Sequence, residues 1–178
     1  MSDSAKNIDF LHGDILHILF NMYWLYTLGN EIEKKESTKL YLGLISTIAL
    51  ISNTSYYLVA GPSFVGMSGV IYGLIGYIWA RDNFESNSSY RVDEGLVKFF
   101  VFWFVLCWAL TIIKFMGVAN TIHGVGALSG IGFGYIIAQI KNKKLKRKIH
   151  FSDDIKQQLT IISILVLGGM VVDYLSYG

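Results

Sequence analysis

Long apolar blocks separated by short polar segments make up most of this chain. A helix that crosses a lipid bilayer needs about 20 predominantly apolar residues. Six blocks approach that length, at about residues 15–29, 40–51, 68–81, 96–115, 121–140 and 159–177. The pattern predicts an all-α fold, a polytopic membrane helix bundle of about six transmembrane helices that forms a single membrane domain over residues 1–178.

The stretch between the second and third blocks, residues 52–66, breaks this pattern. It reads SNTSYYLVAGPSFVG, carries no charge and contains the only proline of the chain. It is too polar for a lipid-facing helix and too apolar for an ordinary loop, so we expect a re-entrant segment before the Ser68 helix. That helix has only about 14 residues, or about 21 Å at 1.5 Å per residue. We therefore expect Ser68 to lie below the membrane surface.

The composition supports a membrane protein, and the cysteine count excludes two kinds of cysteine-based structure. Hydrophobic residues make up 53% of the chain and charged residues 16%, whereas about a quarter of an ordinary soluble domain is charged. The single cysteine, Cys107, excludes an intramolecular disulfide and a cysteine-based metal site.

Positive charge is distributed unevenly between the two sides of the predicted bundle. With the loops assigned alternately, every lysine and arginine except Lys6 and Lys114 falls on one side. Cytoplasmic loops are the ones enriched in these residues, so both termini and the Ser68 end are expected outside the cytoplasm. The basic run at residues 141–148 is then a topology determinant, and we expect no nucleic-acid partner.

Ser68 stands between glycines in the sequence GMSGVIYG, residues 66–73, at the start of an apolar helix. At a helix N-terminus, unpaired N–H groups and the helix dipole favour a developing negative charge. Gly66 and Gly69 allow a tight turn and the close approach of a substrate backbone. Serine is also a common small residue at helix contacts in membranes, so this residue alone does not decide between catalysis and packing.

His123 opens the fifth apolar block in the sequence HGVGALSGIGFG. An ionisable residue inside a membrane helix is costly and often functional, and a neutral histidine can act as a general base. Gly126 and Gly130 follow it with a spacing of four residues. The same spacing recurs at Gly69 and Gly73, and it gives helices flat faces that pack closely. Packing explains the glycines, but it does not explain why each face begins with a residue capable of catalysis.

His17 and Asn21 are four residues apart, so they share one face of the first helix. An asparagine amide and the N–H of a neutral histidine can both donate hydrogen bonds to an oxyanion. A hydrogen bond between helices is the alternative role for this pair. Asp173 lies in the last apolar block, where we expect it near the outer interface of the membrane, and we assign it no role.

Motifs that the sequence lacks exclude several kinds of chemistry. There is no HExxH motif, which argues against a zinc protease. No Asp or Glu lies deep in the first five helices, so a paired-aspartate protease and a Ser-His-Asp triad lack their carboxylates. A phosphate-binding GxxxxGK[ST] loop and a Rossmann fingerprint are also missing. What remains is a dyad of Ser68 and His123 that needs no metal and no cofactor.

Three motifs together resemble the rhomboid family of intramembrane serine proteases, in its bacterial type. They are HxxxN at His17 and Asn21, GxSGxxxG around Ser68, and HxxGxxxG beginning at His123. The resemblance runs over about residues 11–138, the rhomboid-like core, and an extra C-terminal helix follows at about 159–177. It implies that Ser68 is the nucleophile, that His123 is the general base, and that Tyr72 packs beside His123. It also implies an oxyanion hole formed by His17, Asn21 and the Ser68 backbone N–H.

The resemblance makes the expected function an intramembrane serine endopeptidase that cleaves transmembrane segments of membrane proteins. It would act in the inner membrane of a bacterium, with the site toward the non-cytoplasmic side. No counterpart of the family's first helix is present, and either residues upstream of Met1 supply it or another element replaces it. The alternative function is therefore a catalytically inactive rhomboid-like protein that binds transmembrane helices without cleaving them. A small transporter would show repeated halves, and the sequence has no such repeat.

Overall fold

The computed structural model describes residues 3–62, 66–146 and 151–177, with side chains from residue 15 onward. The described residues form six helices and no strand, which confirms the predicted all-α class. The helices are α1 (Asp3–Glu33), α2 (Thr38–Ala60), α3 (Ser68–Phe84), α4 (Glu94–Ile112), α5 (Asn120–Lys144) and α6 (Asp153–Tyr177).

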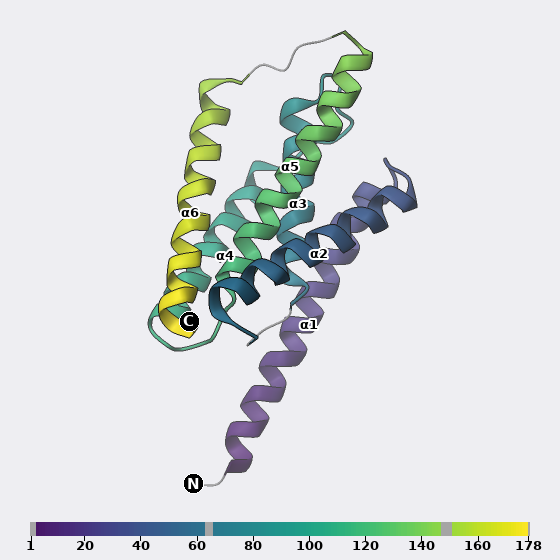
Figure 1. Ribbon diagram of the computed structural model, residues 1–178. Coiled ribbons are helices and arrows are strands. Elements are labelled where there is room, and N and C mark those ends of the chain that lie inside the picture. The colour runs from purple at the N-terminus through teal and green to yellow at the C-terminus, as the bar shows by residue number, and fades with distance from the viewer. Residues whose placement is uncertain (1–2, 63–65, 147–150, 178) are drawn as a thin grey trace.

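Helices α3 and α5 lie side by side at the centre of the bundle, and their contact is the most extensive between any two helices (Figure 1). α1 and α2 pack on one side of this pair, while α4 and α6 contact each other on the other side. The N-terminal part of α1 extends away from the other helices (Figure 1). The pair α3 and α5 is therefore the scaffold that positions any central site.

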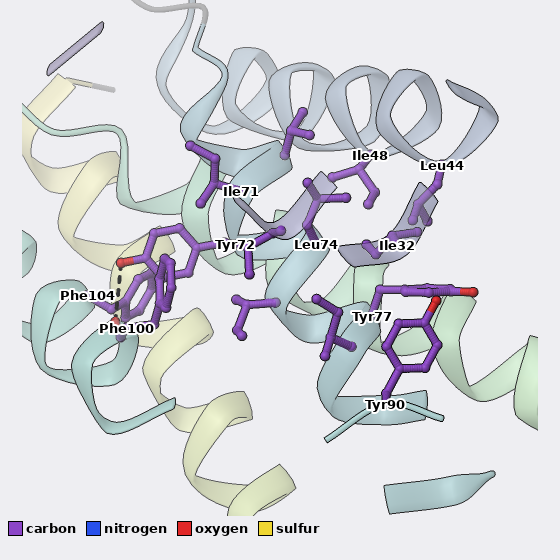
Figure 2. Packing of buried hydrophobic residues seen from close by; sticks show 14 residues of the cluster. Ile32, Leu44, Ile48, Ile71, Tyr72, Leu74, Tyr77, Tyr90, Phe100 and Phe104 are labelled. Atoms are coloured by element: carbon purple, nitrogen blue, oxygen red, sulfur yellow. Dashed lines mark hydrogen bonds between the residues drawn. The ribbon is translucent and has the colours of Figure 1, made fainter. Parts of the chain in front are cut away.

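The sequence of α3 is apolar on every face as far as Ala80, which is typical of a membrane span or of a helix buried in protein. Every residue from Gly69 to Arg81 is buried, and at Gly69, Gly73 and Gly76 the absence of a side chain lets the backbone of α5 come close. Figure 2 shows the side chains that enclose α3: Ile32 from α1, Ile48 from α2, and Phe100 and Phe104 from α4.

Four of the described helices, α2, α4, α5 and α6, are long and apolar enough to cross a membrane. α3 has 17 residues and spans about 25 Å at 1.5 Å per residue, slightly less than the hydrocarbon core of a bilayer. Because the other helices enclose α3, it has little contact with lipid. The polytopic helical bundle is as predicted, although by length and composition these four helices, and not six, qualify as spans.

The predicted re-entrant segment is wrong for residues 52–60, which continue α2 as a helix. Two of the polar side chains that suggested it, those of Ser52 and Asn53, donate hydrogen bonds within the helix. Ser52 Oγ donates to the carbonyl of Ile48 at 2.8 Å, and Asn53 Nδ2 donates to the carbonyl of Ala49 at 2.8 Å. α2 ends only at Gly61, whose positive φ of 77° suits glycine. Residues 63–65 of the predicted segment lie outside the described residues.

A charged cluster closes the end of the bundle opposite Ser68. The Arg81 side chain is fully buried and bonds to the carboxylates of Glu36 and Glu85. Lys141 Nζ lies 3.3 Å from Glu36 Oε1 and 3.5 Å from Glu85 Oε1. Burial alone raises the pKa of Glu36, but the hydrogen bond and charge of Arg81, together with Lys141, outweigh burial and hold this pKa below its ordinary value of 4.5. The cluster joins the loop after α1 to α3 and α5.

Candidate active site

Ser68 and His123 meet at the same end of the central helix pair. Ser68 is the first residue of α3 and His123 is the fourth residue of α5. The distance from Ser68 Oγ to His123 Nε2 is 2.8 Å, which is a hydrogen bond. Ser68 is half-buried and the His123 side chain is buried. The two residues are 55 positions apart in sequence, so the fold brings them together.

The glycines that follow each of these residues explain why they can meet. A Cβ added to Gly126 would overlap the carbonyl of Gly69, and one added to Gly130 would overlap the carbonyl of Gly73. On the other helix, a Cβ at Gly69 would lie 2.8 Å from the carbonyl oxygen of Ile122. Backbone therefore packs directly on backbone along both helices. The spacing of four, predicted from sequence to give close-packing faces, does so here.

The imidazole of His123 is held on one face by Tyr72. The two rings stack with their centroids 4.7 Å apart and an interplanar angle of 26°. The Tyr72 hydroxyl donates to the carbonyl of Phe100 at 3.3 Å, and the ring packs edge-on against Phe100 and Phe104 (Figure 2). Tyr72 therefore links the His123 ring to α4.

The other ring nitrogen of His123, Nδ1, is buried and has no hydrogen-bond partner among the described residues. In a serine protease triad, this nitrogen would donate to a carboxylate. The arrangement is therefore a serine–histidine pair in which packing and the helix backbone orient the imidazole. No group of three or more metal-ligating side chains occurs in the described part of the chain.

Gly66 stands just before Ser68, and Asn53 of α2 holds it in place. The backbone N of Gly66 donates to Asn53 Oδ1 at 2.9 Å, and Asn53 Nδ2 donates to the carbonyl of Gly66 at 3.3 Å. A Cβ added to Gly66 would lie 3.6 Å from Ser68 Oγ, with no other atom within 4 Å. A side chain at residue 66 would therefore begin beside the Ser68 hydroxyl. Our sequence reasoning missed Asn53, although an amide in an apolar block is a usable signal.

His17 and Asn21 lie on α1, and no described hydrogen bond joins them to Ser68 or His123. Asn21 is buried, and its Nδ2 donates to the backbone carbonyl of His17 at 2.7 Å. Its Oδ1 is buried without a partner among the described residues. His17 is exposed. The predicted oxyanion hole therefore stays a prediction, with one hydrogen of the Asn21 amide still available to donate.

Asp173 has contacts that the sequence reasoning did not anticipate. Its expected position near the outer interface of the membrane stays a prediction, and within the protein its side chain is fully buried. Its carboxylate bonds to the backbone of Asn120 and Thr121, the first two residues of α5. An acidic residue inside an apolar helix was the available signal, and the partner could not be read from it because the bonds go to backbone N–H groups.

Comparison with known proteins shows which family this chain belongs to. The model of the rhomboid domain family matches residues 8–140, about three quarters of the chain. Among curated proteins, the rhomboid proteases GlpG of Klebsiella pneumoniae and of Salmonella paratyphi A are each 32% identical to it over 127 residues. These alignments cover 71% of this chain and 45% of each relative, so the chain spans about half the length of the curated relatives it matches. On this match, the chain belongs to the rhomboid family.

Proposed function

We propose that this protein is an intramembrane serine endopeptidase that cleaves transmembrane segments of other membrane proteins. The observation that supports this best is the 2.8 Å separation of Ser68 Oγ and His123 Nε2. A serine hydroxyl within hydrogen-bonding distance of a histidine nitrogen is the arrangement that activates a serine nucleophile. Membership of a family whose curated relatives are named rhomboid proteases supports the same activity.

In this mechanism, Ser68 Oγ attacks a peptide carbonyl carbon while its proton passes to His123 Nε2. The C–N bond then breaks, and His123 gives the proton to the departing amine, which leaves an ester on Ser68. A water molecule, deprotonated by His123, cleaves the ester and restores the hydroxyl. For the first step Nε2 must be the nitrogen without hydrogen, so Nδ1 carries it.

The oxyanion of the tetrahedral intermediate needs hydrogen-bond donors. We assign this role to the backbone N–H of Ser68, the amide of Asn21 and the imidazole of His17. Ser68 begins α3, where the N–H groups have no partner within the helix and the helix dipole favours negative charge. The second hydrogen of Asn21 Nδ2 is the donor that its bond to the His17 carbonyl leaves over.

The chain is an integral membrane protein, as its family and its apolar helices indicate. For its orientation, we propose that the Ser68 end faces the non-cytoplasmic side of a bacterial plasma membrane. The distribution of lysine and arginine supports this direction. So does the position of Arg81 and Lys141, which lie at the opposite end of the bundle from Ser68.

The test is cleavage of a model transmembrane substrate in proteoliposomes by the wild-type chain, Ser68→Ala and His123→Ala. We expect the wild type to cleave and both variants to lose about 10⁴-fold or more in kcat, because neither retains a complete nucleophile and base. Ser129→Ala is the matched control, since this α5 hydroxyl bonds only to the Val125 carbonyl of its own helix among the described residues.

A second outcome would redirect the proposal. If the folded wild type binds the substrate segment, measured by crosslinking, yet cleaves it no faster than Ser68→Ala, the endopeptidase function fails. The protein would then be a rhomboid relative that binds transmembrane helices without cutting them. The absence of a described hydrogen bond from His17 or Asn21 to the Ser68–His123 pair is the observation that keeps this outcome in the test.

A further inference from the structure

Asp173 carries a carboxylate into an apolar part of α6. The residues before it, from Leu159 to Val172, include no other charge, and its side chain is 0% exposed. Burying a carboxylate at this depth is expensive unless its oxygens are hydrogen-bonded. The groups that bond to the carboxylate therefore decide what it can do.

Both oxygens of Asp173 accept hydrogen bonds from the first turn of α5. Oδ1 accepts from the backbone N of Asn120 at 3.2 Å and from Asn120 Nδ2 at 2.9 Å. Oδ2 accepts from the backbone N of Thr121 at 2.6 Å. The first N–H groups of a helix have no partner within it, and Ala119, which precedes α5, makes no side-chain cap. α6 thus supplies the N-terminal cap that α5 lacks.

The packing of α6 on α5 leads the carboxylate to this position. Gly169 lies one turn before Asp173, and a Cβ added to it would lie only 3.2 Å from the Cβ of Asn120. Earlier in α6, Val166 packs on Gly124, where an added Cβ would lie 3.0 Å from Val166 Cγ1. The buried face of α6 therefore follows the beginning of α5 closely, and Asp173 ends that face at the helix terminus.

The capped turn leads directly to His123, which follows Thr121 by two residues. No described side chain holds the imidazole through Nδ1. Its position relative to Ser68 therefore depends on the backbone of α5 and on the stacked ring of Tyr72. A shift of the first turn of α5 would move the imidazole with it.

We propose that Asp173 is a positioning residue, which fixes the first turn of α5 and thereby holds His123 Nε2 at hydrogen-bonding distance from Ser68 Oγ. This role rests on the proposed function, because it concerns the same pair. Asp173 acts through the helix backbone, since its described hydrogen bonds end on Asn120 and Thr121 and not on the imidazole.

The first measurement compares kcat and KM of the full chain in proteoliposomes for wild type, Asp173→Ala and Asp153→Ala. Asp153 is the matched control, because it begins the same helix and its side chain is 98% exposed. Misplacing a catalytic group by about 1 Å can cost about 10²-fold in rate. We expect kcat of Asp173→Ala to fall by about 10- to 100-fold with little change in KM, and Asp153→Ala to match the wild type.

A second-site variant separates capping from a general loss of structure. Ala119→Ser places a hydroxyl acceptor at the N-cap of α5, where serine is strongly preferred. In the Asp173→Ala background it is expected to restore kcat several-fold. A hydroxyl at residue 119 cannot restore the packing of α6, so recovery would identify the lost cap as the cause.

Hydrogen–deuterium exchange gives a readout that does not depend on cleavage. We expect faster exchange over residues 120–124 in Asp173→Ala, recovery in the double variant, and no change in α3. If the wild type proves inactive, the proposed function fails, and exchange alone still decides whether Asp173 fixes this turn. If Asp173→Ala does not fold, Asp173→Asn, which keeps one acceptor oxygen, takes its place with a smaller expected effect.

Three results would overturn the inference. One is an Asp173 variant whose exchange at the start of α5 equals that of the wild type. Another is an active wild type together with a folded Asp173→Ala of unchanged kcat. The third is a double variant in which Ala119→Ser restores neither the exchange nor the rate.

Discussion

At the scale of single residues, the candidate site includes side chains that form hydrogen bonds with the backbone of neighbouring segments. Asn53 on α2 bonds to both the N–H and the carbonyl of Gly66, two residues before Ser68. This segment leads into α3, so its position sets the direction of the Ser68 N–H that we assign to the oxyanion. Asn53 therefore connects α2 to the candidate site through the backbone of Gly66. None of its described hydrogen bonds goes to the Ser68 hydroxyl.

We predict that Asn53→Ala lowers kcat for cleavage by about tenfold, because two hydrogen bonds of about 1 kcal/mol each fix the segment. Thr47→Ala is the control, since the Thr47 hydroxyl bonds only to the carbonyl of Gly43 in its own helix among the described residues. Steady-state cleavage in proteoliposomes measures both. Equal kcat values for the two variants would show that the Asn53 bonds do not influence the reaction.

Residues with unusual chemistry for a membrane could be predicted from sequence, and those that bond to backbone could not. Ser68 and His123 were identified because a histidine in an apolar helix and a serine between glycines are conspicuous, and the structure brings them together. Asn53 and Asp173 were missed as site residues because their partners are N–H and carbonyl groups of distant segments. Every residue has such groups, so no sequence pattern identifies the partner.

At the scale of helices, the contact between α3 and α5 determines the distance between Ser68 and His123. The carbonyls of Gly69 and Gly73 occupy the places where Cβ atoms of Gly126 and Gly130 would lie. No side chain separates the two backbones there, so nothing flexible can absorb an added atom.

We predict that Gly130→Ala separates the helices, lowers stability by about 1–3 kcal/mol and reduces cleavage. Gly132→Ala is the matched control on the same helix, because a Cβ added to Gly132 meets no atom within 4 Å. Thermal unfolding in detergent micelles and cleavage in proteoliposomes measure the two effects. A Gly130→Ala protein as stable and active as Gly132→Ala would contradict this account of the contact.

The helices themselves were predicted well where apolar runs were unbroken, and less well at α2. Polar residues at 52 and 53 suggested that the second helix ends near residue 51, whereas it continues to Ala60. Ser52 and Asn53 donate to carbonyls one turn earlier, so they remain inside the helix without an unpaired group. Composition alone does not distinguish such a helix from a loop.

At the scale of the whole molecule, the charged cluster around Arg81 closes the bundle at the end away from the site. We predict that Glu36→Gln lowers the free energy of unfolding at pH 7 by about 1–3 kcal/mol. The substitution removes the carboxylate charge that pairs with the buried guanidinium of Arg81. Glu94→Gln is the control, since its ion pair with Lys98 is exposed.

The pH dependence of this difference follows from the lowered pKa of Glu36. A carboxyl group whose pKa is lower in the folded state stabilises the protein above its unfolded pKa, and this contribution is lost as the pH falls through the folded pKa. Protonated Glu36 resembles glutamine, so the stability of wild type and Glu36→Gln should converge below the ordinary value of 4.5. Thermal midpoints from pH 7 to pH 3 measure this, and a constant difference would contradict it.

The order of synthesis gives Asp173 a further consequence. A ribosome makes α5 before α6, so Ser68 and His123 are both synthesised before the carboxylate that caps α5. Asn120 and Asp173 are 53 residues apart in sequence. A nascent chain that stalls between His123 and Asp173 carries both members of the pair without the cap, so under the proposed role of Asp173 the arrangement of the pair is completed only when α6 is made.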